Sequence, residues 1–300
     1  MIDFKTVELN DKTWMEPLIR AGNIQACHQN FTNIYVWKGS YNQVVAQVGG
    51  YMVVKTGKEP DRMYYYFPSG SGDVKPVIET MMEDARENGS PFVMIGVSPE
   101  QTALLDTLYP GRFRYTEDRD NWDYIYLLDK LVSLGGKKLH GKRNHINRFM
   151  ENNWSYEEIT PENIPECWQM NVEWCKINGC GEDRSLRQEA CAVEKTFDNY
   201  TALGIEGGLL RLDGRVIAFT MGEKLNSDTF VTHIEKAFGE IQGAYPMINR
   251  EFAAQIQRKH PEIIYVDREE DVGDEGLRKA KLSYYPDLMA EKNIARLLHT

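Results

Sequence analysis

The 300-residue chain lacks the features that define several broad protein classes. It has five cysteines, an odd number with no CxxC pair, so neither a disulfide framework nor a zinc knuckle is predicted and we expect reduced, packed thiols. No uncharged apolar run approaches the roughly 18 residues that cross a bilayer. The N-terminal residues have no basic region followed by an apolar stretch, so no signal peptide is predicted. We therefore expect a cytoplasmic protein without a transmembrane segment.

Signatures of several enzyme chemistries are also missing. The six histidines are scattered, with no HExxH or similar spacing, so no metal site is predicted. No GxSxG elbow and no Walker loop occur. The formal net charge of −10 excludes nonspecific coating of DNA, which requires many cations facing phosphates. A local basic cluster is still able to bind one phosphate-rich ligand.

What is present indicates a folded chain of two domains. The composition is 42% hydrophobic, 11% aromatic and 27% charged, and 300 residues exceed the usual single domain. Turn residues divide the first half into short strands and helices, which indicates mixed α/β structure. After Gly135-Gly136 a segment rich in Lys and Arg begins. We therefore expect one domain over residues 1–135 and a second over residues 136–300.

A basic segment opens the expected second domain. Residues 137–148 contain five Lys or Arg and no Asp or Glu. One interpretation is that Lys142, Arg143 and Arg148 contact the phosphates of tRNA or another anionic ligand. The alternative is an exposed helix whose cations pair with the acidic body of the protein.

The order of elements in the second half resembles the core of the GNAT acyltransferase fold. A hairpin around Asp213-Gly214, a strand at 229–237, a glycine-bearing loop at 238–244, a helix from about 246 and a strand at 263–266 follow one another. In acetyl-CoA enzymes such a loop holds the pyrophosphate at a helix N-terminus. Here the loop lacks a basic residue and carries Glu240, which would repel a pyrophosphate. The loop therefore argues against ordinary CoA binding.

Three segments carry a resemblance to a known family. Residues 140–149 (HGKRNHINRF), 232–253 and especially 268–286 (REEDVGDEGLRKAKLSYYP) resemble the phosphatidylglycerol lysyltransferase C-terminal family, which is related to the Fem aminoacyltransferases. The resemblance implies an α/β (α+β) fold of two tandem GNAT-like domains, each a mixed, mostly antiparallel sheet flanked by helices. It also implies an active site in the C-terminal domain.

The same resemblance implies an activity. An aminoacyl group would move from aminoacyl-tRNA to an amine or hydroxyl acceptor, by direct attack and without a covalent enzyme intermediate. The acceptor would be a small molecule or a lipid headgroup, and acyl-CoA is the less favoured donor. The known lysyltransferases attach this domain to transmembrane helices, which this sequence lacks, so a lipid is the less favoured acceptor.

Catalytic candidates follow from the resemblance and from the predicted strands. Lys281 matches a Fem-motif lysine and is the candidate for stabilising the tetrahedral oxyanion. Glu235 is the candidate general base, because it is on the strand that lines the acyl site in GNAT-like folds. His233, two residues earlier, is expected on the same face of that strand and is a candidate for the same role. The alternative for Glu235 is a salt bridge with Lys236 or Arg250.

Further residues are candidates for binding substrate. Arg278 shares a helical face with Lys281 and is expected to clamp a donor phosphate, unless it pairs with Asp271 or its acidic neighbours. The others are taken from the start of the helix after the glycine loop and from the longest matching segment: Asn249, Arg250, Arg268, Glu269, Asp271 and Tyr284. For Asn249 and Arg250 the alternative is a capping or surface role, and for Glu269 and Asp271 it is charge at a helix N-terminus.

Two other functions stay open at this point. One is a CoA-dependent N-acetyltransferase, and the other is a noncatalytic GNAT-like binding protein. A solvent-facing Lys281 would support the noncatalytic alternative, whereas Lys281 and Glu235 facing one site would argue against it.

Overall fold

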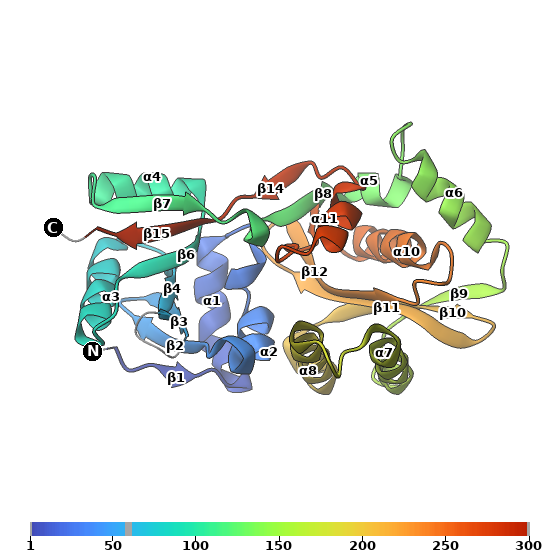
Figure 1. Ribbon diagram of the computed structural model, residues 1–300, viewed down its shortest axis with the longest axis horizontal. Helices are drawn as coiled ribbons and strands as arrows, with labels where there is room; N and C mark the ends of the chain where they lie inside the picture. The colour runs from blue at the N-terminus through green and yellow to red at the C-terminus, as the bar shows by residue number, and fades with distance from the viewer. Residues whose placement is uncertain (1, 58–61, 299–300) are drawn as a thin grey trace. The chain divides into compact units, whose positions relative to one another are not determined.

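The computed structural model describes residues 2–57 and 62–298, which form two compact units (Figure 1). The first unit contains residues 1–123, 270–278 and 289–300, and the second contains residues 124–269 and 279–288. The junction therefore lies at 123/124 rather than near residue 135. The difference arises because residues after Asp123 pair with strands of the second unit and because two segments near the C-terminus return to the first.

The first unit is built on an eight-stranded sheet in the order β1-β2-β3-β4-β6-β15-β7, with β5 paired to β3. Among the described residues of this sheet, β4 and β6 pair in parallel and the other neighbouring strands pair antiparallel. The strands are β1 (Lys5–Thr6), β2 (Val44–Val48), β3 (Tyr51–Thr56), β4 (Tyr64–Tyr66), β5 (Ser69–Gly70), β6 (Val93–Val97), β7 (Phe113–Glu117) and β15 (Asn293–Leu297). The C-terminal strand β15 thus separates β6 from β7.

Helices of the first unit bury apolar side chains against this sheet. The core gathers around Tyr65, Phe92 and Phe113, whose rings are in contact. The helices are α1 (Lys12–Gly22), α2 (Phe31–Tyr41), α3 (Lys75–Glu87) and α4 (Pro99–Leu108). Ser98 begins α4 with a reciprocal capping box to Gln101, as the sequence Ser-Pro-Glu-Gln favours.

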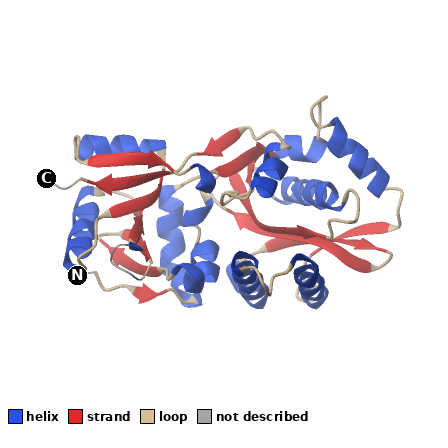
Figure 2. Cartoon of the chain, in the orientation of Figure 1, coloured by secondary structure: helices blue, strands red, loops and turns tan. Residues whose placement is uncertain are grey.

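The second unit is built on a seven-stranded sheet in the order β14-β8-β13-β12-β11-β10-β9. Figure 2 shows its strands in red and the helices in blue. The hairpin predicted at Asp213-Gly214 joins β10 to β11, and Asp213 adopts the left-handed backbone conformation that this turn requires. The strands are β8 (Asp123–Leu127), β9 (Trp154–Glu158), β10 (Glu206–Leu212), β11 (Arg215–Lys224), β12 (Thr229–Ala237), β13 (Tyr265–Asp267) and β14 (Leu288–Ala290).

Strands β12 and β13 diverge, and this divergence positions the site described below. They are parallel, but their pairing extends only from Thr229 opposite Tyr265 to Val231 opposite Asp267. Strand β12 continues to Ala237, whereas β13 ends at Asp267. Glu235, in the second half of β12, and Arg268, directly after β13, lie in contact where this pairing has ended.

Helices cover both faces of this sheet. In Figure 1, α10 lies on one face of β10–β12, and α7 and α8 lie on the other. Phe252 of α10 contacts Phe230 on one face, and Phe197 of α8 contacts Phe219 on the opposite face. The helices are α5 (Leu128–Ser133), α6 (His140–Phe149), α7 (Ile164–Asn178), α8 (Arg184–Asp198), α9 (Tyr200–Leu203), α10 (Ala244–Lys259) and α11 (Glu275–Leu282).

One cysteine pair differs from the expectation of reduced thiols. Cys175 and Cys180 form a disulfide at the end of α7. The helix ends at Gly179, whose left-handed backbone (φ 75°) reverses the chain and brings Cys180 back to Cys175. The spacing of the two residues gave no signal of this, because the pairing depends on where the helix ends.

Among the described residues, no helix combines the length and the apolar character that a bilayer span requires.

Candidate functional site

The site is organised around Glu235, where β12 leaves β13. One carboxylate oxygen of Glu235 accepts a hydrogen bond from Arg268 Nη2 at 2.8 Å, and the other accepts one from Asn249 Nδ2 at 3.0 Å. Burial alone would lower the pKa of Arg268, but the Glu235 carboxylate outweighs burial and holds that pKa above its usual value. The structure thus joins three predicted site residues from β12, α10 and the chain after β13.

Two aromatic rings extend this group. The Arg268 guanidinium lies 4.8 Å from the centre of the Tyr284 ring, and Lys142 Nζ lies 4.1 Å from the same centre. Tyr126 packs edge-on against Tyr284 with ring centres 6.3 Å apart. Burial, assisted by the positive charge of Arg268, lowers the pKa of Lys142. We call Lys142, Glu235, Asn249, Arg268 and Tyr284 the Glu235 cluster.

Two buried polar atoms of this cluster have unused hydrogen-bonding capacity. Arg268 Nη1 and Asn249 Oδ1 are inaccessible to solvent and have no hydrogen-bond partner among the described residues. A buried donor or acceptor without a partner is costly, and such atoms are uncommon in folded proteins. The cluster therefore presents one unused cationic donor and one unused amide acceptor, both fixed by Glu235.

Lys281 is buried and acts on the backbone beside the cluster. Its side chain reaches back from α11, and Nζ donates hydrogen bonds to the carbonyl of Arg268 at 2.6 Å and to that of Glu269 at 3.1 Å. Glu269 has a left-handed backbone (φ 59°), which turns these carbonyls toward one point. Tyr126 in turn donates to the Lys281 carbonyl at 2.7 Å. Lys281 therefore positions Arg268 rather than presenting a bare ammonium group to solvent.

His233 occupies a separate buried group of charges. Its Nδ1 lies 2.8 Å from Glu269 Oε1 and its Nε2 lies 3.1 Å from Glu223 Oε1. Burial alone would lower the pKa of His233, but the hydrogen bonds to Glu223 and Glu269 raise it to about 10. An imidazolium held between two carboxylates has no free lone pair near neutral pH. The base role predicted for His233 therefore does not fit this geometry.

The basic residues of the segment 137–148 do not act as one group. Lys142 belongs to the Glu235 cluster, whereas Arg143 donates to the carbonyls of Leu134 and, at 2.7 Å, of Gly136. Arg143 thus holds the loop before α6. Arg148 is exposed on the same helix. Of the three, Arg148 is the one whose charge is directed at solvent.

Other predicted binding residues have partners within the protein. In the first unit, Arg278 forms a bidentate pair with buried Asp271, with both N–O distances at 2.8 Å, and also contacts Asp120 at 2.6 Å. This is the internal pairing that the sequence left open as an alternative. In the second unit, Arg250 pairs with Glu251 rather than with Glu235. Neither arginine presents an uncompensated charge.

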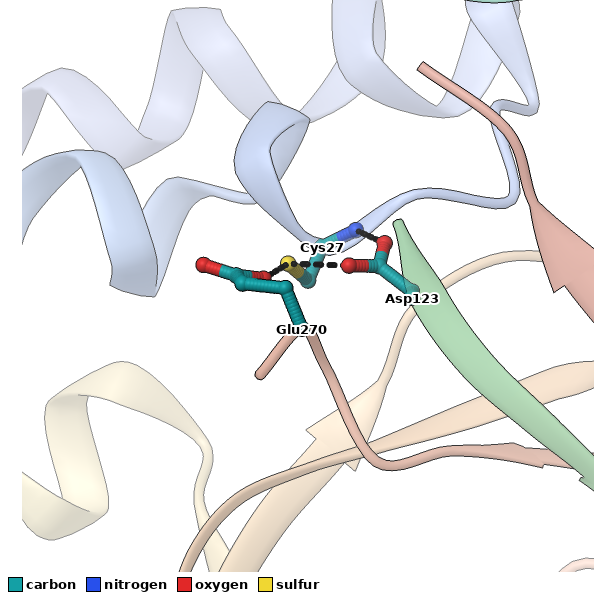
Figure 3. Close-up of side chains that lie close together, drawn as sticks. All are labelled: Cys27, Asp123 and Glu270. Atoms are coloured by element: carbon teal, nitrogen blue, oxygen red, sulfur yellow. Dashed lines mark hydrogen bonds between the residues drawn. The ribbon is translucent and has the colours of Figure 1, made fainter. Parts of the chain in front are cut away.

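The first unit holds a second buried cluster, made of Cys27, Asp123 and Glu270 (Figure 3). The ligand atoms of these three side chains lie within 4.8 Å of one another, a composition suited to a metal ion. However, Lys292 Nζ lies 2.7 Å from Asp123, 3.7 Å from Glu270 and 3.7 Å from the Cys27 sulfur. Burial lowers the pKa of Lys292, but the surrounding acidic groups outweigh it and hold the pKa well above its usual value. The Lys292 ammonium thus supplies the cation that these ligands require.

Sequence reasoning missed the partners that define these groups. Tyr126 was not a candidate, because its role depends on Tyr284, which lies far along the chain, and Glu223 was not a candidate, because its contact with His233 crosses from β11 to β12. Tyr126 lies in β8, and nothing in the sequence of that strand connects it to Tyr284. Glu223 ends a mainly apolar run in β11 that begins at Val216, and a charged residue at the end of such a run is the one signal that would have identified it.

Comparison with known proteins identifies the class and then the family. The two units have the tandem GNAT-like architecture, since the chain superimposes on FemX with a TM-score of 0.64 at 10% identity, over 99% of this chain and 98% of that one. The family model for the phosphatidylglycerol lysyltransferase C-terminal domain matches residues 20–296. The chain therefore belongs to that family, and the predicted fold class and resemblance are confirmed.

Individual relatives are consistent with this assignment. A Bacteroides thetaiotaomicron protein of unknown function is 41% identical, with a TM-score of 0.93 over 99% of this chain and 100% of that one. The C-terminal domain of a putative lysylphosphatidylglycerol synthetase from Agrobacterium fabrum has the same fold, with 12% identity and a TM-score of 0.68 over 96% and 93%. An uncharacterized Mycoplasmoides gallisepticum protein is 25% identical over 189 residues, or 59% of this chain, and the match spans about half (56%) of that protein.

Proposed function

We propose that the protein is an acyltransferase that moves an aminoacyl group from aminoacyl-tRNA to an amine or hydroxyl acceptor by direct attack. The single observation that carries the proposal is the pair of unused atoms in the Glu235 cluster, Arg268 Nη1 and Asn249 Oδ1. Membership of the lysyltransferase family supports the reaction class. The proposal requires no cofactor.

The two atoms match what acyl transfer demands. When the acceptor attacks the ester carbonyl, negative charge develops on the carbonyl oxygen, and a fixed buried donor such as Arg268 Nη1 stabilises it. The attacking N–H or O–H group of the substrate donates a hydrogen bond to Asn249 Oδ1, and this hydrogen bond orients the nucleophile. The new C–N or C–O bond forms as the ester C–O bond to the tRNA breaks.

Glu235 links these two functions. It accepts hydrogen bonds from both Arg268 and Asn249. It therefore fixes the group that stabilises the oxyanion relative to the group that orients the nucleophile. Its carboxylate oxygens keep lone pairs beyond these two bonds, and we assign to it the proton lost by the attacking group. That proton then passes to the ribose oxygen that leaves with the tRNA, so the step is balanced without a further reactant.

The CoA-dependent alternative is disfavoured by the start of α10. Gly243 precedes this helix with a left-handed backbone (φ 87°), and a β-carbon there would collide with the carbonyl of His145 in α6. Gln242 also contacts His145, at 3.3 Å. Helix α6 therefore covers the turn at which a GNAT enzyme would hold a pyrophosphate. Together with Glu240, this packing supports a donor other than acyl-CoA.

The decisive experiment offers the protein a choice of donors. The full chain is incubated with a pool of tRNAs charged with radiolabelled amino acids and, separately, with labelled acyl-CoAs, each with a mixture of amine and hydroxyl acceptors. We expect label to leave the charged tRNA and not the CoA thioester. Consumption of acyl-CoA alone would support the N-acetyltransferase, and consumption of neither donor would support a noncatalytic protein.

A matched pair of variants tests the assignment of Arg268. Arg268→Lys keeps a positive charge but removes Nη1, and we expect transfer to fall about 100-fold or more. Arg258→Lys makes the same chemical change at an exposed position of α10 and is expected to leave transfer unchanged. Equal rates in the two variants would remove Arg268 from the mechanism.

A further inference from the structure

A cavity between α7 and α8 lies apart from the Glu235 cluster. Its volume is about 360 Å³, which is in the range of pockets for small organic ligands. Along β12 the side chains alternate: Glu235 contacts α10, whereas Lys236 contacts Glu189 of α8 and the Trp174 ring of α7. The cavity between α7 and α8 is therefore on the opposite face of the sheet from Asn249 and α10.

The walls of this cavity are mainly apolar. Trp168 and Val172 of α7 line it together with Ala190 of α8. The Cys175–Cys180 disulfide closes one side, because it ties the end of α7 to the turn that leads toward α8. A ligand held here would have a largely apolar body.

Asn171 adds a buried acceptor to these walls. Asn171 is one of the lining residues, it is 1% exposed, and its Oδ1 is buried without a hydrogen-bond partner among the described residues. A buried amide oxygen without a partner loses its hydration and gains nothing in return. A ligand that donates an O–H or N–H to Asn171 would restore that hydrogen bond.

The charged residues that line the cavity are both cationic. Lys176 of α7 and Arg187 of α8 are exposed, and neither forms an ion pair with another residue in the described part of the chain. Lys176 and Arg187 are exposed whereas Asn171 is buried, so the positive charge of the lining lies in its solvent-accessible part. This arrangement favours an anionic group at the exposed end of the ligand.

We propose that this cavity binds a small amphipathic anion. The ligand has an apolar, preferably aromatic body against Trp168, a hydrogen-bond donor directed at Asn171 Oδ1, and a carboxylate or similar anion near Lys176 and Arg187. The site is independent of the proposed aminoacyl transfer, since none of its lining residues belongs to the Glu235 cluster.

The test uses three probes that differ in one feature each. We titrate 4-hydroxyphenylacetate, phenylacetate and tyramine into the full chain and measure binding by ligand-observed NMR and calorimetry. The first probe has all three features, the second lacks the donor, and the third replaces the anion by a cation. We expect saturable binding of 4-hydroxyphenylacetate, about tenfold weaker binding of phenylacetate, and no saturable binding of tyramine.

Variants connect these preferences to the cavity. Asn171→Leu should bind 4-hydroxyphenylacetate and phenylacetate equally, and Arg187→Ala should weaken both about tenfold. Arg184→Ala, an exposed arginine of α8 outside the lining, is the matched control and should change neither. Ala190→Phe fills the cavity from α8 and should abolish binding even if Asn171→Leu fails to fold.

Three results would overturn the proposal. The first is the absence of saturable binding by either aromatic acid at millimolar concentration. The second is undiminished binding to Ala190→Phe, which would place the ligand elsewhere. The third is tyramine binding as tightly as 4-hydroxyphenylacetate. Each of these readouts is independent of transferase activity, so the outcome does not depend on the proposed function.

Discussion

The charge on His233 makes the stability of the second unit depend on pH in a defined direction. Folding raises the pKa of His233 from 6.5 to about 10 because Glu223 and Glu269 bind its two nitrogens. The stabilisation is therefore fully present below pH 6.5, where both states bind the proton. It declines as pH rises from 6.5, where only the unfolded chain loses the proton, and is lost above about pH 10.

The size of the effect follows from the two pKa values. Each unit of difference corresponds to about 1.4 kcal/mol, so this pair of values gives roughly 5 kcal/mol across the whole interval. The side chain of His233 is only 5% exposed, so screening by solvent reduces this little. Raising the pH from 6.5 to 9 should therefore lower the free energy of unfolding by roughly 3 kcal/mol, because the unfolded chain loses the His233 proton while the folded chain keeps it.

The assay compares wild type with His233→Gln by urea unfolding at several pH values between 6 and 10. Wild type should lose its advantage over the variant as pH rises, and NMR of the imidazole should show no titration between pH 6 and 8. His140→Gln, at an exposed position of α6, controls for a general effect of removing a histidine. Titration of His233 near pH 6.5 with a pH-independent difference in stability would refute the reasoning.

Two further substitutions test buried cations. Lys281→Met leaves the Arg268 and Glu269 carbonyls without their hydrogen-bond donor. We therefore expect loss of transfer and a decrease of about 1–3 kcal/mol in the free energy of unfolding. The control, Lys279→Met, is at an exposed position of α11 and should cost little stability. Urea unfolding and the transfer assay measure both, and a stable but inactive Lys281→Met would instead support direct action on the oxyanion. Lys292→Met should destabilise the first unit by about 3–5 kcal/mol because it leaves Asp123 buried without its cation. Adding Asp123→Asn should recover part of that loss, and a double variant no more stable than Lys292→Met would contradict the explanation.

Local sequence signals predicted the centre of the second unit well. The Asp213-Gly214 turn, the alternation along 229–237 and the apolar spacing after the glycine loop correspond to β10–β11, β12 and α10. These elements are adjacent in sequence, so their patterns carry the information for their pairing. Strand β15 was not predicted, because its partners β6 and β7 lie far earlier in the chain, with Val97 196 residues before Asn293, and a five-residue strand has no distinctive pattern.

The sequence named residues that lie together in the structure, and their part in catalysis stays a prediction. Glu235, Asn249, Arg268, Tyr284 and Lys142 were all named from the sequence, and the structure brings them together. Their roles depend on contacts that no local pattern reveals. Whether a charged group is exposed, paired or buried is decided by its neighbours in space. For this reason the contacts of Lys281, His233 and Arg278 within the protein were not decided by the sequence.

The position of β15 has a consequence for biosynthesis. Residues 293–297 fill the gap between two strands made much earlier, so on the ribosome the N-terminal sheet has to wait, open at that gap, while the intervening polypeptide emerges. The second sheet, whose strands β8–β13 emerge before β15, can close sooner. The part of the protein translated first is thus the part that matures last, and a stop codon shortly before residue 293 would leave the N-terminal half unfinished and exposed to proteases.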